Sequence, residues 1–195
     1  MNGFRLKYPP KDSDHRRGDL EAPIILVEYG DFECPYCASA VQKIENLIRY
    51  FGSEMCFIYR HFPIIKIHPN AGVAAVASEA ADLQGKFWEM HHILFENYQN
   101  LEGDKLLYLA RDLKLDLRLF SNDMEFEKLA TRVQQDVSEG LNNGIVSTPA
   151  FFLNEILLKA IPTVEEIAIK LKDAPLLKHQ QKSPQDEHPT RLDFH

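Results

Sequence analysis

The chain has 195 residues, which is enough for one domain of generous size or for a small domain that carries an insertion. Its 45% of hydrophobic and 26% of charged residues are typical of an ordinary globular protein. The 29 acidic residues outnumber the 22 Lys and Arg residues, and the basic residues form no cluster, so we exclude a nucleic-acid partner.

Residues 1–22 are polar and contain prolines, and we expect them to form an N-terminal arm over the surface. The first twenty residues lack the apolar core of a signal peptide. No apolar run reaches about 20 residues, the length that a membrane-spanning helix needs. We therefore expect no membrane partner and a cytoplasmic location, or a periplasmic location if a leader has been removed.

A strand, a helix and a second strand are predicted next. Residues 24–30 (IILVEYG) form a β-branched run that predicts a strand buried on both faces. Apolar residues then follow at helical spacing as far as Phe51, and Gly52 is suited to end that helix. Residues 55–62 predict a second buried strand, which Pro63 terminates. This order indicates a right-handed βαβ crossover.

The next part of the chain, at about residues 68–144, predicts an inserted helical block. Its first helix is the Ala-rich segment 71–83, for which Asn70 is a candidate N-cap. Three further segments repeat apolar residues at i, i+3 and i+4, namely 87–98, 104–113 and 126–141. Asp104 is a candidate cap for the second of these. The block therefore separates the first two strands from the rest of the sheet.

Strand character returns after the helical block. Residues 150–153 and 156–158 predict an antiparallel pair joined by a tight turn at 154–155. Thr163 and Glu166 form a capping box that opens a last helix. The polar residues 174–195 predict a disordered tail. Residues 23–173 are thus expected to form one α/β domain, with the order β-α-β, helical block, β-β-α and a sheet of about four strands.

The sequence Cys34-Pro35-Tyr36-Cys37 lies where the first strand meets the first helix. Unpaired N–H groups and the helix dipole favour a negative charge at a helix N-terminus, so the pKa of Cys34 should be lowered. The Cys34 thiolate is then the candidate nucleophile, and Cys37 is the thiol that resolves the mixed disulfide. Pro35 removes an N–H that would have no partner in the first helical turn.

Two alternatives remain for the cysteine pair on these residues alone. It could be half of a zinc site, or two buried thiols without a role. The chain has no second Cys-x-x-Cys and no His-x-x-x-His, although His61 and His68 could complete a site. The strand-to-helix position favours redox chemistry. We therefore assign no metal ligand and no cofactor, because the cysteines themselves carry the two electrons.

Two other features are candidates for the same site. Glu28 is an acid inside an apolar strand, and it either points outward at a sheet edge or is a buried acid that relays a proton for Cys37. The pair Thr148-Pro149 precedes the later strands, either as a plain loop or as a cis peptide that presents backbone to a substrate chain. Cys56, His61 and His91 are interpreted as core residues.

The segment from Gly18 to Cys37, which contains VEYGDFECPYC, resembles the DsbA-like branch of the thioredoxin superfamily. Residues 146–152 (VSTPAFF) resemble the cis-proline segment of that family, and a helical insertion of matching size lies between the two motifs. The resemblance covers residues 15–173. It implies a thioredoxin-like fold and a reversible dithiol–disulfide centre that acts on protein thiols and disulfides. It also implies a cis peptide before Pro149, substrate contacts from Thr148 and a buried acid at Glu28.

The chain departs from that family at the residues between the cysteines. Strong oxidants of the family commonly have Pro-His between the cysteines, whereas this chain has Pro35-Tyr36. We expect Pro35 and Tyr36 to contact the substrate as well. A histidine stabilises the thiolate, so we expect a less oxidising centre here. A redox partner must recycle the pair, and glutathione is one candidate. The alternatives are a redox-silent peptide-binding or chaperone-like module, a small zinc-binding protein, and a relative that handles glutathione or small thiols.

Overall fold

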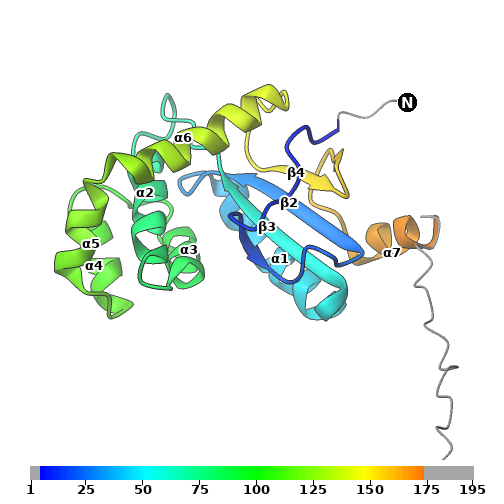
Figure 1. The fold of residues 1–195 in the computed structure, drawn as a ribbon, viewed down its shortest axis with the longest axis horizontal. Coiled ribbons are helices and arrows are strands. Elements are labelled where there is room, and N and C mark those ends of the chain that lie inside the picture. Colours follow the sequence, from blue (N-terminus) through cyan, green and yellow to red (C-terminus); the bar gives the residue numbers. More distant parts are fainter. Residues whose placement is uncertain (1–4, 174–195) are drawn as a thin grey trace, which may run out of the picture.

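The computed structural model describes residues 5–173, whose centre is a mixed five-stranded sheet (Figure 1). The strand order is β1-β3-β2-β4-β5. β2 and β3 are parallel, and every other neighbouring pair is antiparallel. The strands are β1 (His15–Arg17), β2 (Ile24–Gly30), β3 (Met55–His61), β4 (Ala150–Leu153) and β5 (Ile156–Leu157).

Two helices, α1 and α6, pack against β3 of the sheet, and α2 to α5 lie beyond its end. Figure 1 shows α2 to α5 gathered on one side, α6 running from that side over the sheet, and α7 at the opposite end. Their bounds are α1 (Pro35–Phe51), α2 (Ala71–Asp82), α3 (Phe87–Glu96), α4 (Lys105–Asp112), α5 (Leu117–Met124), α6 (Glu127–Asn142) and α7 (Val164–Asp173), with a 3-10 turn η1 (Gly52–Glu54) after α1. This order confirms the predicted thioredoxin-like α/β fold. None of the helices within residues 5–173 has the length and apolar character needed to cross a membrane.

Most of the predicted turns and caps are present. Gly52 ends α1 with φ 54°, and the hairpin turn has positive φ at Asn154 and Glu155. Thr163 and Glu166 form both hydrogen bonds of a capping box, at 2.8 and 3.2 Å. Asn70 and Asp104 stand at the N-caps of their helices as predicted, but neither side chain makes a cap bond, and that of Asn70 donates to Glu33 Oε1 at 2.9 Å instead. The tail expected at 174–195 lies outside the described residues.

The sheet is buried on both faces, as the apolar run in β2 predicts. On one face, β2 and β3 residues such as Leu26 and Phe57 share a core with α1 and the helical block. On the other face, a second core contains Leu6, Val27, Tyr29, Cys56, Ile58, Phe62, Ile145 and Phe152. Successive residues of a strand point to opposite faces, so Glu28 and Tyr59 face α1 whereas Tyr29 and Arg60 face the second core.

The N-terminal segment corrects two expectations. It is not an arm on the surface, because Leu6, Asp14 and His15 are buried. Arg5 forms a bridge with Ile156 beside one edge of the sheet, and residues 15–17 pair with β3 at the other edge. The segment therefore crosses and covers the second core. Because β1 is a fifth strand, the expected number of about four strands is too low. The three residues of β1 are polar and have no alternating apolar pattern that would predict a strand.

Arg60 fixes this segment on the sheet. Its side chain is fully buried and forms a two-bonded pair with Asp14, at 3.1 and 2.9 Å. The same guanidinium donates to the carbonyl oxygens of Tyr8 and Pro9 and to the Tyr29 hydroxyl. A buried guanidinium needs this number of acceptors, because an unpaired buried charge is strongly destabilising.

We predict that Asp14→Ala lowers the free energy of unfolding by about 3 kcal/mol or more, because it removes the carboxylate that is hydrogen-bonded to the buried Arg60 guanidinium and leaves only the Glu139 carboxylate at 3.7 Å. The measurement is urea unfolding followed by circular dichroism. Asp12→Ala is the matched control, since Asp12 has a 92% exposed side chain and contacts Arg16 at 3.4 Å. The control should stay within about 0.5 kcal/mol of the parent. Equal losses in the two variants would show that the Arg60 pair does not fix the segment.

Candidate active site

The two cysteines lie at the N-terminal end of α1, directly after β2. Cys34 is the N-cap residue with extended φ and ψ, and Pro35 occupies the first helical turn. The Cys34 N–H donates to the Asp31 carbonyl, and the Cys34 carbonyl accepts from the Ala38 N–H as the first bond of the helix. Cys34 is 3% exposed and Cys37 is fully buried, and both thiols are free. The structure thus places Cys34 at the start of α1, where the sequence predicted it.

Cys34 is surrounded by groups that favour its thiolate. Its pKa is lowered to about 5, first because the Cys37 thiol donates a hydrogen bond to it. The side chain of Thr148 and the backbone N–H groups of Cys37 and Tyr36 lower the pKa further, against the opposing effect of burial. When it is protonated, the Cys34 thiol can donate a hydrogen bond to the Thr148 carbonyl oxygen, which lies 3.4 Å from Sγ. Cys34 is therefore largely ionised at neutral pH.

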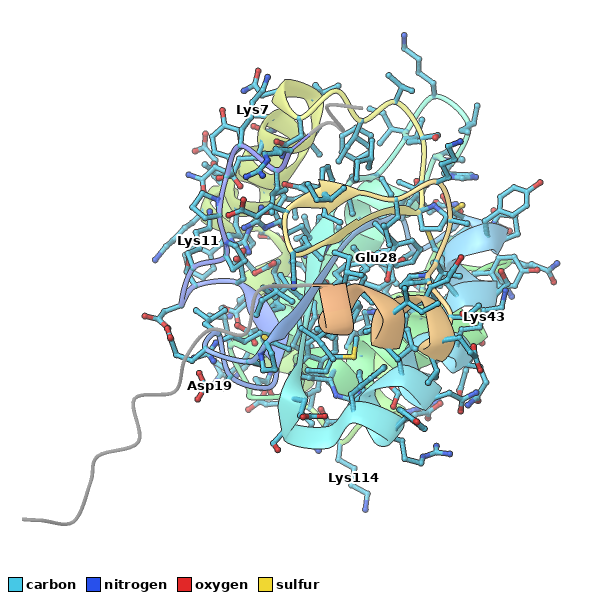
Figure 2. The ribbon with its side chains drawn as sticks, turned by 90° about the vertical axis from the view of Figure 1, so that its right-hand side faces the viewer. Lys7, Lys11, Asp19, Glu28, Lys43 and Lys114 are labelled. Carbon is cyan, nitrogen blue, oxygen red and sulfur yellow. The ribbon has the colours of Figure 1, made fainter. Side chains whose placement is uncertain are left out.

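Cys37 and Glu28 have the opposite properties. Burial raises the pKa of Cys37 well above its usual value, and the hydrogen bond to Cys34 and the charges of Glu28 and Cys34 raise it further. Burial also raises the pKa of Glu28 to about 8, helped by the Cys34 charge, while a hydrogen bond with Cys37 lowers it in part. Figure 2 shows Glu28 near the middle of the outline, just above the orange helix α7, whereas Lys43 and Lys114 lie at its rim.

Glu28 is 1% exposed, which contradicts the outward-pointing alternative for this residue. One of its oxygens, Oε1, has no hydrogen-bond partner within residues 5–173, and neither has the hydroxyl of Tyr59. Tyr59 is the register partner of Glu28 on the adjacent strand, and its ring covers Gly30, where an added Cβ would lie 2.4 Å from the ring. The carboxyl group is therefore held in a dry environment beside Cys37.

Two acidic residues that the sequence analysis did not single out fix the loop before Cys34. Asp31 accepts hydrogen bonds from the backbone N–H groups of Glu33 and Ile64 and pairs with His68 Nδ1 at 2.8 Å. Glu33 accepts from the backbone and the side chain of Asn70. These contacts join the loop at 31–34 to the loop between β3 and α2. Acidic residues that accept a hydrogen bond from a nearby backbone N–H are common in such turns. The partners of Asp31 and Glu33 in the loop after β3 are distant in sequence, so no local pattern predicts these contacts.

The predicted substrate-binding residues gather beside the cysteines. Tyr36, Thr148 and Pro149 line a groove of about 270 Å³, together with Ser39, Ala40, Lys43, Phe151, Lys159, Ala160 and Ile161. The peptide between Thr148 and Pro149 is cis. Tyr36 is 73% exposed, whereas Thr148 is buried. Pro35 is exposed but does not line this groove.

The remaining cysteine and the histidines lie apart from this chemistry. Cys56 is fully buried in the second core, and burial raises its pKa to about 11, as expected of an inert thiol. His61 and His91 are buried, and His68 is engaged by Asp31. Within the described residues, neither Cys34 nor Cys37 belongs to a group of three potential metal ligands. The geometry therefore does not favour a zinc site at the cysteine pair.

Comparison with known proteins agrees with this geometry. A protein family described as Thioredoxin matches residues 11–173. Among solved structures, BdbD of Bacillus subtilis shares 23% identity over 88% of this chain and 98% of its own, with a TM-score of 0.74. A thioredoxin-like oxidoreductase of Silicibacter pomeroyi shares 24% over 84% of this chain and 93% of its own, with a TM-score of 0.71. Wolbachia pipientis α-DsbA1 shares 23%, covers 84% and 92% of the two chains, and has the same TM-score.

Curated relatives with higher identity are much longer proteins. The Na⁺/H⁺ antiporter NhaA 1 of Mycolicibacterium vanbaalenii is 41% identical over 157 residues, which are 79% of this chain and 25% of the antiporter. The NhaA 1 protein of Salinispora arenicola is 43% identical over 143 residues, 73% of this chain and 22% of its own. The chain therefore spans about a quarter of the length of these relatives.

We predict that Cys34 in the reduced protein reacts with iodoacetamide at a rate that rises with pH and is half-maximal near pH 5. The thiolate is the reactive form, and its pKa lies far below the ordinary value of 9.0. The rate is measured by mass spectrometry of the modified peptide in a Cys37→Ala and a parent background. Because the Cys37 hydrogen bond is the largest cause of the lowered pKa, the midpoint should move upward in Cys37→Ala. A midpoint near 9 in the parent would contradict the described site.

Proposed function

The chain belongs to the thioredoxin family, and on this premise we propose that it is a thiol–disulfide oxidoreductase that exchanges disulfides with protein substrates through Cys34 and Cys37. The observation that carries the proposal is the opposite shift of the two thiols, with the pKa of Cys34 lowered to about 5 and that of Cys37 raised. One thiol is prepared to attack, and the other keeps its proton until it is needed. A lowered pKa on one thiol and a raised pKa on the other is expected of a redox-active pair. An inert buried thiol such as Cys56 shows only a raised pKa.

In the reducing direction, the Cys34 thiolate attacks one sulfur of a substrate disulfide and forms a mixed disulfide, which releases the other sulfur as a thiolate. Cys37 then loses its proton and attacks Cys34 Sγ. This step releases the second substrate thiolate and leaves a Cys34–Cys37 disulfide. Two electrons have passed to the substrate, and a redox partner must supply two electrons to restore the dithiol. The oxidising direction is the same sequence in reverse.

Glu28 is proposed as the group that accepts the proton of Cys37. Formation of the mixed disulfide removes the negative charge of Cys34, which is one of the two causes that raise the pKa of Glu28. With its pKa lowered, Glu28 gives its own proton to the released substrate thiolate and becomes a carboxylate, which can accept the proton of Cys37. Its hydrogen bond with Cys37 provides the route for the proton.

The surface around the site supports a polypeptide as substrate. Tyr36, between the two cysteines, and Val146, two residues before Thr148, are 73% and 86% exposed, and Ile65 and Ile67 of the loop after β3 are also exposed. Exposed apolar side chains around a reactive centre suit contacts with an unfolded or extended chain. Thr148 is proposed to contact that chain through its backbone.

Glutathione is a second candidate, either as a substrate or as the recycling partner. Lys43 and Lys159 line the groove beside Tyr36 and Pro149. Two ammonium groups there can pair with the carboxylates of a small acidic thiol. Ion transport, the activity in the name of the longer relatives, is no part of this proposal.

The proposal predicts that Cys37→Ser accumulates a mixed disulfide with a peptide that carries a disulfide, because the resolving thiol is absent. Mass spectrometry of acid-quenched mixtures should show one covalently bound peptide at Cys34. Cys34→Ser should form no adduct, and Cys56→Ser, the matched control, should turn over like the parent. Peptide binding without any adduct would contradict the oxidoreductase and favour a redox-silent binding module.

In the same assay, Glu28→Gln should slow the escape from the mixed disulfide by about 100-fold while leaving its formation nearly unchanged. The exposed Glu54 provides the control Glu54→Gln, which should change neither step. Equal slowing of both steps by Glu28→Gln would assign a structural role to this carboxyl group.

A further inference from the structure

A buried cluster of His15, His61 and Glu79 lies away from the cysteine pair and has no role in the proposed exchange. His15 belongs to β1, His61 ends β3, and Glu79 belongs to α2. His15 Nε2 lies 2.7 Å and His61 Nε2 lies 2.9 Å from the same oxygen, Glu79 Oε1. The three side chains are 8%, 0% and 5% exposed. Two imidazoles and one carboxylate thus converge on one point between the sheet and the helical block.

The ring of His15 faces a carboxylate on both of its nitrogens. Its Nδ1 lies 3.8 Å from Asp82 Oδ1, one helical turn after Glu79, while its Nε2 faces Glu79. A neutral imidazole carries a proton on only one nitrogen. With the proton on Nε2, His15 donates to Glu79 Oε1. With the proton on Nδ1, the lone pair of Nε2 faces Glu79 Oε1, and a cation between these two atoms would be coordinated by both.

The geometry fits a metal ion with small adjustments. Ligand atoms about 2.1 Å from an ion lie about 3.0 Å apart at right angles and about 3.4 Å apart at a tetrahedral angle. The distances of 2.7 and 2.9 Å to Glu79 Oε1 therefore need to lengthen by about 0.1 to 0.3 Å for ligands at right angles and by about 0.5 to 0.7 Å for tetrahedral ligands, and all three ligand atoms already lie within 4.8 Å of one another.

We propose that His15, His61 and Glu79 bind one divalent transition-metal ion of the zinc type. Two histidines and one carboxylate are a common ligand set for zinc. Asp82 Oδ1 lies 3.8 Å from His15 Nδ1, beyond hydrogen-bond distance, so it would have to move closer to orient the ring as a carboxylate commonly does for a ligating histidine. The ring of Phe87 stacks on His15 at 3.5 Å, and the ring of Phe32 lies 5.9 Å from that of His61, so the site has an apolar surround.

The bound ion joins parts of the chain that are distant in sequence. It links β1 and β3 of the sheet to α2, the first helix of the inserted block. Phe32, which contacts His61, lies two residues before Cys34. The ion therefore holds the helical block in place beside the redox loop, and it takes no part in the transfer of electrons.

The test uses the full chain with Cys34→Ser and Cys37→Ser, so that thiolates cannot bind the metal. After treatment with a chelator, the protein is titrated with Co²⁺ and then with Zn²⁺ in competition with a chromophoric chelator. We expect one equivalent of each ion, visible Co²⁺ d–d bands without thiolate charge-transfer bands, and a higher melting temperature with Zn²⁺. Failure of this protein to bind a stoichiometric ion would overturn the proposal.

Glu79→Gln and His61→Gln, made in the same background, should weaken Zn²⁺ binding by more than about 100-fold. This loss exceeds the loss of about 10- to 100-fold that is typical when a residue that only contacts a metal ligand is changed. His92→Gln is the control, because His92 pairs with Glu45 outside the cluster. Circular dichroism of the metal-free variants verifies that they fold. Unchanged Zn²⁺ affinity in both ligand variants would place the ion elsewhere and contradict the assignment.

Discussion

Three ionisable groups, Cys34, Cys37 and Glu28, share one buried site at the end of β2, where the surroundings stabilise a single negative charge. The N-terminal end of α1 and the hydrogen bond from Cys37 place that charge on Cys34. Burial and the Cys34 charge keep Glu28 and Cys37 protonated. Because the charge cannot be on two of these groups at low cost, loss of the Cys34 charge in a mixed disulfide makes the next deprotonation easier. In the proposed disulfide exchange, the order of the two chemical steps follows from this competition.

The fold provides the dry environment that this competition needs. β2 is covered by α1 on one face and by the N-terminal segment on the other, and the buried Arg60–Asp14 pair fixes that segment. Asp31 and Glu33 join the redox loop to the loop after β3. The inserted helical block contacts the sheet through a polar cluster around Glu79. Contacts far from the cysteines therefore hold in place the elements that bury them.

Sequence periodicity predicted the elements whose signals are local. The apolar run of β2, the helical spacing after the cysteines and the capping box at Thr163 are all present in the structure. Features that depend on distant partners were missed. β1 consists of three polar residues that form a strand because they pair with β3. The side chain of Asn70 donates to Glu33 and does not cap its own helix. The cluster of His15 with Glu79 joins residues 64 positions apart, so no spacing motif announces it.

The most direct test of the central claim, that the folded protein stabilises the Cys34 thiolate, is the equilibrium redox potential of the pair, titrated against glutathione with alkylation read by mass spectrometry. A stabilised thiolate favours the reduced form and makes the disulfide more oxidising. The account predicts a reversible two-electron couple with a reduction potential of about −200 mV. This value lies between the potentials of thioredoxin, about −270 mV, and DsbA, about −120 mV. A potential at or below that of thioredoxin, or the lack of any reversible couple, would contradict it.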